Sequence, residues 1–191
     1  MRSVMNILAL QGSPRTNGNT AALLSALLDV LASQHTVHQF HVARLALSPC
    51  LSCYRCQKQQ TCPTNDDMHL LYPHLAHCDM VILASPIYFY GVTAQLKSVI
   101  DRCQHLWLNP LPQRRDRTGV LVLTAGAPDQ YGQGAQITTD ACRIFFSCLG
   151  APLAHTLLAT NTDRHPVTQQ PDALQAAVLL GELLLTKARP N

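Results

Sequence analysis

The chain has 191 residues, of which 47% are hydrophobic and 13% charged, and its formal net charge is +3. This length suits one well-buried domain over residues 1–191, and the composition excludes a disordered or coiled-coil protein. The small charge and the lack of a basic run give no support for nucleic-acid or membrane binding.

The first predicted elements are a strand, a polar loop and a helix. Residues 4–10 form a short apolar run, and leucines at helical spacing predict a helix over about 18–33. Between them lies QGSPRTNGNT, which is rich in hydroxyl, amide and small side chains. Backbone N–H groups at a helix start bind phosphate with the help of the helix dipole. The candidate donors are Ser13, Arg15, Asn17, Asn19 and Thr20.

This loop lacks both the lysine of GxxxxGK[ST] and the spacing of GxGxxG. We therefore expect it to bind a monophosphate rather than a nucleoside triphosphate or a dinucleotide. A phosphate monoester after the first strand of a doubly wound sheet is how a flavodoxin-type domain holds FMN. The alternative is that Asn17 and Gly18 form only a turn, and that Asn19 or Thr20 is only a helix cap.

The rest of the chain alternates strands and helices. We expect strands at 36–43, 80–84, 119–123 and 152–159, helices at 66–77, 92–105, 134–149 and 172–187, a cysteine-bearing loop at 48–64, and an exposed loop at 107–117. The runs at 80–84 and 119–123 are continuously apolar, which is typical of strands buried on both faces of a parallel sheet. The alternation predicts an α/β fold with right-handed crossovers.

Four cysteines, Cys50, Cys53, Cys56 and Cys62, have the spacing C-x2-C-x2-C-x5-C, and Pro63 follows the last. A compact triplet plus a further thiolate is typical of a 4Fe-4S cluster. Structural zinc, free thiols, and a redox-sensing disulfide remain alternatives. We expect the other four cysteines to be buried apolar groups, and most of the nine histidines to be solvated.

Two further loops follow strands whose carboxyl ends should meet the first loop. Pro86, Ile87, Tyr88 and Phe89 supply an aromatic bed and backbone N–H groups for an isoalloxazine ring, whereas Thr124, Ala125 and Gly126 allow close backbone approach. Ordinary core packing is the alternative for the aromatics, but three in succession cannot all face one core from a strand.

QGSPRTNGNT, SPIYFYGVTAQLKSVIDR and the cysteine loop ahead of Asp66 together resemble the NADPH-dependent FMN reductase family, and the cysteine pattern is most similar to its iron-sulfur flavoprotein branch. The resemblance implies a flavodoxin-like three-layer sandwich with a five-stranded parallel sheet in the order 2-1-3-4-5. It also implies non-covalent FMN, NAD(P)H as co-substrate, and a homodimer or homotetramer. The residues proposed above would then hold the phosphate and the ring.

We therefore expect a cytoplasmic FMN-dependent NAD(P)H oxidoreductase that passes electrons to a small acceptor such as a quinone, a nitro compound, a ferric species or a flavin. No side chain is expected to act as a catalytic acid or base, because the cofactor carries the chemistry. One alternative is an iron-sulfur flavoprotein that exchanges single electrons with ferredoxin. A second is a non-catalytic thiol redox sensor on the same scaffold.

Overall fold

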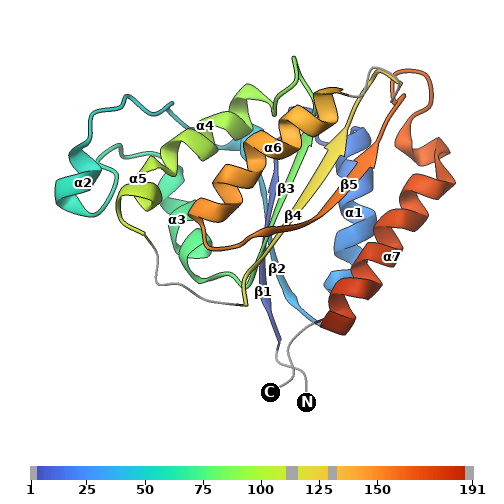
Figure 1. Ribbon diagram of the computed structural model, residues 1–191, viewed down its shortest axis with the longest axis horizontal. Helices are drawn as coiled ribbons and strands as arrows, with labels where there is room; N and C mark the ends of the chain where they lie inside the picture. Colours follow the sequence, from blue (N-terminus) through green and yellow to red (C-terminus); the bar gives the residue numbers. More distant parts are fainter. Residues whose placement is uncertain (1–3, 111–115, 129–132, 188–191) are drawn as a thin grey trace.

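The computed structural model describes residues 4–110, 116–128 and 133–187. Five parallel strands form one sheet in the order β2-β1-β3-β4-β5, with helices on both faces (Figure 1). The strands are β1 (Asn6–Gln11), β2 (Thr36–His41), β3 (Met80–Pro86), β4 (Thr118–Thr124) and β5 (Leu153–Ala159). The helices are α1 (Asn19–Leu31), η1 (Val42–Arg44), α2 (Arg55–Gln59), α3 (Met68–His77), α4 (Ala94–Arg102), α5 (Gln104–Leu108), α6 (Gln133–Cys148), η3 (Val167–Gln169) and α7 (Pro171–Lys187). The predicted fold class and strand order are confirmed.

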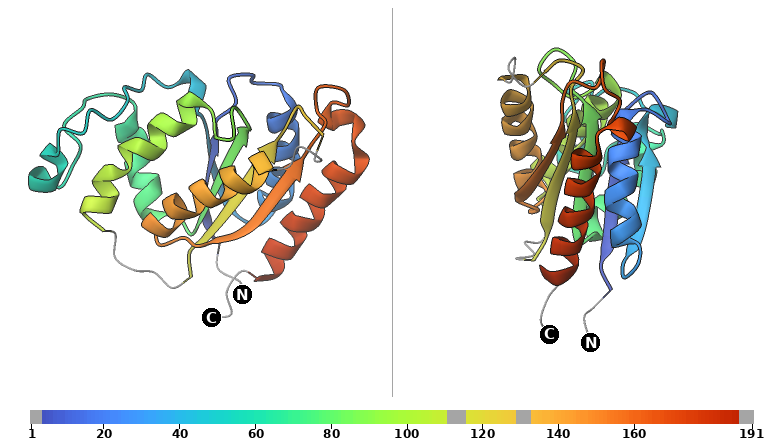
Figure 2. Two further views of the ribbon diagram at one scale, coloured as in Figure 1. Left: turned by 45° about the horizontal axis from the view of Figure 1, so that its top comes forward. Right: turned by 90° about the vertical axis from the view of Figure 1, so that its right-hand side faces the viewer.

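Strands β3 and β4 are buried on both faces, as their uninterrupted apolar sequences predicted, and β1 is buried on both faces from Ile7 onward. Leu8 and Leu10 pack with α3, α4 and α6, whereas Ile7 and Ala9 pack with α1 and α7. Because successive side chains of a strand point to opposite faces, each strand contributes to two separate hydrophobic cores. Helices α3 to α6 lie on one side of the sheet and α1 and α7 on the other (Figure 1), and the right-hand view of Figure 2 shows α1 and α7 in front of the strands.

The candidate loops all leave the sheet at its carboxyl edge, which is the upper edge in Figure 1. The loop after β1 is tied to β3 and α4, because Gly12 N–H donates to the Ala84 carbonyl at 2.7 Å and the Thr93 hydroxyl donates to the Gly12 carbonyl at 2.6 Å. Sheet order thus brings segments that are distant in sequence to one place.

Several local expectations were wrong in detail. The predicted helix over 92–105 is two helices, α4 and α5, and α5 includes Trp107 from the expected exposed loop. Arg117, expected at the end of that loop, is 3% exposed, because its guanidinium donates to the carbonyls of Leu75 and Leu149 at 2.6 and 2.7 Å. Residues 111–115 of that loop lie outside the described residues. Most histidines were expected to be solvated, and His35, which is buried, is an exception.

No helix in the described part of the chain has the length and apolar character needed to cross a lipid bilayer.

Candidate functional site

The start of α1 is built to receive an anion. Gly18 is its N-cap and offers no side-chain acceptor to the first-turn N–H groups, and that turn contains no acidic residue. The Ser13 hydroxyl accepts from Arg15 N–H at 3.2 Å, which fixes the bend of the loop. Uncapped N–H groups at the positive end of a 13-residue helix, with an arginine beside them, suit a phosphate.

Asn19 and Thr20 stand in this first turn, but their side chains are engaged elsewhere. Asn19 donates from Nδ2 to the Thr162 carbonyl at 3.3 Å and accepts from Val167 N–H at 2.9 Å. The buried Thr20 hydroxyl lies 2.7 Å from that of Thr124. These two residues therefore brace the loop against β4 and the segment after β5, and the first-turn backbone N–H groups remain as the candidate donors.

Two cavities lie along the carboxyl edge. The first, of about 110 Å³, is lined by Ser13, Arg15, Gly18, Asn19, Thr20, Pro86, Ile87, Tyr88, Thr124, Gly126, Thr162 and Asp163. The second, of about 180 Å³, is lined by Ile87, Phe89, Tyr90, Ala125, Gly126, Ala127, Pro128, Gly134, Ala135 and Thr160. Because Ile87 and Gly126 line both, the cavities adjoin and lead from the helix start to the aromatic turn.

All but one of the residues predicted to hold the cofactor line these cavities. The exception is Asn17, which lines neither. Thr162 and Asp163, which follow β5, line the first cavity and were not predicted, because the sequence there carries no recognisable phosphate or ring motif. In the second cavity, Gly134 was missed for the same reason, whereas Tyr90 lies in the predicted aromatic turn but was not among the residues predicted to hold the ring.

The aromatic turn projects away from the core. Tyr88 and Gly91 exchange backbone hydrogen bonds of 2.9 and 3.0 Å, and the two residues between them, Phe89 and Tyr90, have φ of 49° and 62°. This left-handed pair makes a tight turn that is costly for aromatic residues. Phe89 is fully exposed at 106%, and Tyr88 and Tyr90 are about half exposed. Strained backbone and exposed rings are typical of a ligand-binding loop.

Side chains approach the backbone closely at two glycines that line the second cavity, Gly126 and Gly134. A methyl group on Gly126 would overlap the Asp163 carboxylate, and one on Gly134 would lie 2.6 Å from Cδ1 of Tyr90. Each glycine thus lets a side chain from another loop close over the backbone. Gly126, the only glycine of the segment 124–126, is therefore placed where the Asp163 carboxylate comes close to the backbone.

The cysteine loop projects from the rest of the domain and lies at the far left of Figure 1. Cys50, Cys53, Cys56 and Cys62 all line one small cavity of about 20 Å³, which α5 also borders. The short helix α2 lies within the loop and was not predicted. It lies between Tyr54 and Gln60, which both have left-handed backbone with φ of 55° and 54°.

The thiols in this loop have unequal environments. Burial raises the pKa of Cys56, and the neighbouring Cys62 adds to the rise. Burial also acts to raise the pKa of Cys62, but hydrogen bonds from Thr64 and the charge of Arg102 outweigh it, so the pKa of Cys62 is lowered. Among the described residues, no three His, Cys, Asp or Glu side chains converge closely enough to bind a single metal ion.

The other cysteines match their expected role only in part. Cys78, Cys103 and Cys142 are buried, and burial raises the pKa of each, but Cys148 is half-buried. Cys103 and Cys148 line another cavity together with Cys50, whereas all four loop cysteines line the small cavity described above.

The comparisons with known proteins agree with this geometry. Residues 5–163 match the family described as NADPH-dependent FMN reductase. Over 134 residues the chain is 35% identical to an iron-sulfur flavoprotein of Methanocaldococcus jannaschii, a match that covers 70% of this chain and 68% of the relative. A second iron-sulfur flavoprotein of that organism is 33% identical over 143 residues, which cover 74% and 71% of the two chains.

Two solved structures share the fold. One is an NAD(P)H:quinone oxidoreductase from Methanothermobacter marburgensis, with a TM-score of 0.76 at 17% identity over 99% of each chain. The other is an FMN-dependent NADH-azoreductase from Bacillus anthracis in complex with FMN, with a TM-score of 0.70 at 12% identity over 94% of this chain and 99% of that one.

Proposed function

The chain belongs to the NADPH-dependent FMN reductase family and is an FMN-dependent oxidoreductase, and on that premise we propose that its flavin exchanges single electrons with a 4Fe-4S cluster. The cluster would be held by Cys50, Cys53, Cys56 and Cys62. The observation that carries the proposal is that all four cysteines line one cavity.

The residues at the carboxyl edge of the sheet fit FMN. The uncapped start of α1 and Arg15 would bind the phosphate, with Ser13 holding the bend. Bound FMN supplies hydride and single-electron chemistry at its ring. The adjoining cavity would take that ring between the aromatic turn and the loop of Ala125 and Gly126. There the chain's own role is to orient the ring and to exclude water from one of its faces.

Two observations favour a cluster over a single zinc ion at the cysteine loop. Zinc bound by four thiolates at about 2.3 Å in a tetrahedron would draw the sulfurs to about 3.8 Å from one another. The described thiols do not converge on a single-ion site, although they share a cavity. A cubane spreads its four thiolates further apart because each ligates a different iron. The iron-sulfur names of the relatives support the same choice.

We assign the electron donor and acceptor to the same two sites. NAD(P)H would reach the flavin at the aromatic turn, where the exposed Phe89 ring is available for stacking with a flat molecule. A small acceptor such as a quinone, a nitro compound or a ferric species would use the same opening. A ferredoxin would exchange electrons through the cysteine loop, and a second subunit would help to cover the flavin.

Anaerobic purification followed by a visible spectrum, and by FMN, iron and acid-labile sulfide analysis, tests the proposal. We expect one FMN and one 4Fe-4S cluster per chain. Protein that binds FMN but no iron after anaerobic reconstitution would overturn the cluster and leave a flavin reductase that serves a small acceptor. Stoichiometric zinc would overturn it as well. Failure to bind FMN at all would overturn the assignment of the carboxyl-edge cavities.

A further inference from the structure

One buried ion pair stands beside the cysteine loop. The guanidinium of Arg102, at the end of α4, lies 2.6 Å from the carboxylate of Asp66, and their side chains are 1% and 9% exposed. Another pair on the same helix, Lys97 with Asp101, also has a separation of 2.6 Å, but its side chains are 56% and 45% exposed. A charge as deeply buried as Arg102 is costly unless it is fully paired, so its position calls for an explanation.

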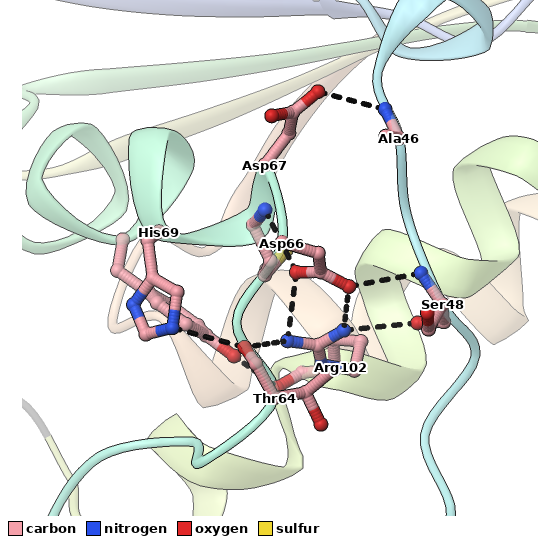
Figure 3. Close-up of polar contacts among 9 residues, drawn as sticks. Ala46, Ser48, Thr64, Asp66, Asp67, His69 and Arg102 are labelled. Atoms are coloured by element: carbon pink, nitrogen blue, oxygen red, sulfur yellow. Dashed lines mark hydrogen bonds and ion pairs between the residues drawn. The ribbon is translucent and has the colours of Figure 1, made fainter.

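The pair holds the two ends of the cysteine loop together (Figure 3). Asp66 accepts from Ser48 N–H at 2.9 Å, and Arg102 donates to the Ser48 carbonyl at 2.9 Å. Arg102 also donates to the Thr64 carbonyl at 3.4 Å. The loop therefore begins and ends on one guanidinium–carboxylate unit, which belongs to the folded core and not to the loop itself.

Arg102 has one donor to spare. Its two Nη atoms make the contacts described above, but its Nε is buried and has no hydrogen-bond partner among the described residues. The Nε of the buried Arg117 is also unpaired, so an orphaned Nε by itself assigns no ligand. Arg102 differs because it lines the cavity that the four thiols share. A buried, unpaired donor on a residue that lines this cavity is available to a sulfur acceptor bound there.

We propose that Arg102 is a positioning residue for the cluster, which fixes both ends of the cysteine loop and offers its spare Nε–H and positive charge to the cluster sulfurs. The inference rests on the proposed cluster. Reduction adds one electron, and so one negative charge, without a change of ligands. Hydrogen bonds to the sulfurs and nearby positive charge favour the reduced form. Arg102 therefore raises the reduction potential of the cluster.

The test compares Asp66→Asn with the double variant Asp66→Asn/Arg102→Met. The asparagine side chain keeps an oxygen that accepts from Ser48 N–H, and the double variant removes the charge of Arg102 without leaving an unpaired carboxylate. The two proteins differ only at Arg102, so their comparison isolates its effect. Lys97→Met is the matched control, because it removes a positive charge from the solvent-facing side of the same helix.

The readouts are iron and sulfide content, the cluster potential from titration with dithionite and mediators followed by EPR, and limited proteolysis of the iron-free proteins. We expect the double variant to have a more negative potential than Asp66→Asn, by more than the shift caused by Lys97→Met. We also expect faster cleavage between residues 48 and 66 in the double variant. Equal potentials in the two proteins, with clusters intact, would overturn the inference.

If the double variant does not fold, the inference is tested by comparing the cluster potentials of the wild-type protein and Asp66→Asn. Removing the carboxylate leaves the guanidinium uncompensated, so the potential of Asp66→Asn should become less negative than that of the wild type. An unchanged potential would overturn the role of the pair. Wild-type protein without iron would instead overturn the cluster itself, which separates a failure of the proposed function from a failure of this inference.

Discussion

The hydroxyl groups of Thr20 and Thr124 lie 2.7 Å apart in buried surroundings, although 104 residues separate them in the chain. The bond joins the first turn of α1 to the end of β4, and so it sets the distance between the candidate phosphate site and the third loop. The two cavities therefore depend on a contact that neither loop could make alone.

Replacing Thr20 with valine keeps the shape of the side chain but leaves the Thr124 hydroxyl without this partner. We expect FMN to bind about tenfold more weakly, equivalent to about 1.4 kcal/mol, as measured by fluorescence titration. Thr138→Val is the control, because the buried Thr138 hydroxyl bonds to the backbone of α6 and lines neither cavity. Equal FMN affinities in the two variants would contradict the bracing role.

Replacing Asn19 with aspartate should separate phosphate binding from ring binding. The aspartate still accepts from Val167 N–H, but it places a negative charge at the helix start, where the phosphate would bind. We expect FMN affinity to fall about tenfold or more, while the affinity for riboflavin, which lacks the phosphate, changes little. A parallel loss for both flavins would mean that the variant acts through the lost bond from Asn19 Nδ2 to the Thr162 carbonyl and not through charge at the phosphate.

Gly126→Ala should close part of the ring cavity, because the added methyl group would overlap the Asp163 carboxylate. We expect a loss of FMN affinity that Asp163→Ala partly restores in the double variant. Gly91→Ala is a suitable control, since its methyl group would meet only the Tyr88 carbonyl oxygen, at 3.7 Å. Isothermal titration of the wild type, the two single variants Gly126→Ala and Asp163→Ala, and the double variant measures the coupling. Strictly additive losses of FMN affinity would argue against a clash between these two groups.

Serine at any one of the four loop cysteines should remove most of the iron and leave FMN content unchanged, because the thiol cavity shares no lining residue with the two flavin cavities. Cys148→Ser serves as the control for a half-buried thiol outside the loop. The measurement is iron, sulfide and FMN per chain after anaerobic purification. Full iron content in all four loop variants would remove the case for a cluster at this site.

Stability should fall as the pH drops below neutrality, in part because of His35. Burial lowers the pKa of His35, whose Nδ1 accepts from Met5 N–H at 3.3 Å, while the nearby Asp79 opposes the shift. Below its unfolded pKa of about 6.5 the unfolded chain binds a proton that the folded protein resists, so protonation favours unfolding.

The variant His35→Asn retains an acceptor for Met5 N–H but cannot titrate. Its free energy of unfolding, measured by denaturant titration between pH 7.5 and 5.5, should decline less steeply than that of the wild type. The difference in slope is at most about 1.4 kcal/mol per pH unit. Identical slopes would show that His35 does not contribute to this dependence.

The parts that could be predicted from the sequence are those fixed by local pattern. The central strands were recognisable because burial on both faces requires an unbroken apolar run, as in residues 80–84. The phosphate loop and the aromatic turn were recognisable because each follows such a strand directly. Three neighbouring aromatics could not all enter one core, and the structure leaves Tyr88, Phe89 and Tyr90 all substantially exposed.

The parts that could not be predicted depend on contacts between distant segments. Arg102 ends an ordinary amphipathic stripe, and its burial follows from Asp66, which lies 36 residues earlier. Asp163 lines the first of the two carboxyl-edge cavities only because β5 is next to β4 in the sheet. Ser52 and Tyr54 have left-handed backbone, which the sequence does not indicate because neither residue is a glycine or an asparagine.

The two ends of the cysteine loop meet at Asp66, so the loop is an insertion attached to the fold at one point. Ser48 and Asp66 are hydrogen-bonded at 2.9 Å, so the intervening segment leaves the framework and returns to the same point. Its removal would sever no strand and interrupt neither layer of packed helices. A single deletion between these two residues could therefore remove all four loop cysteines at once and leave the five-stranded sheet whole.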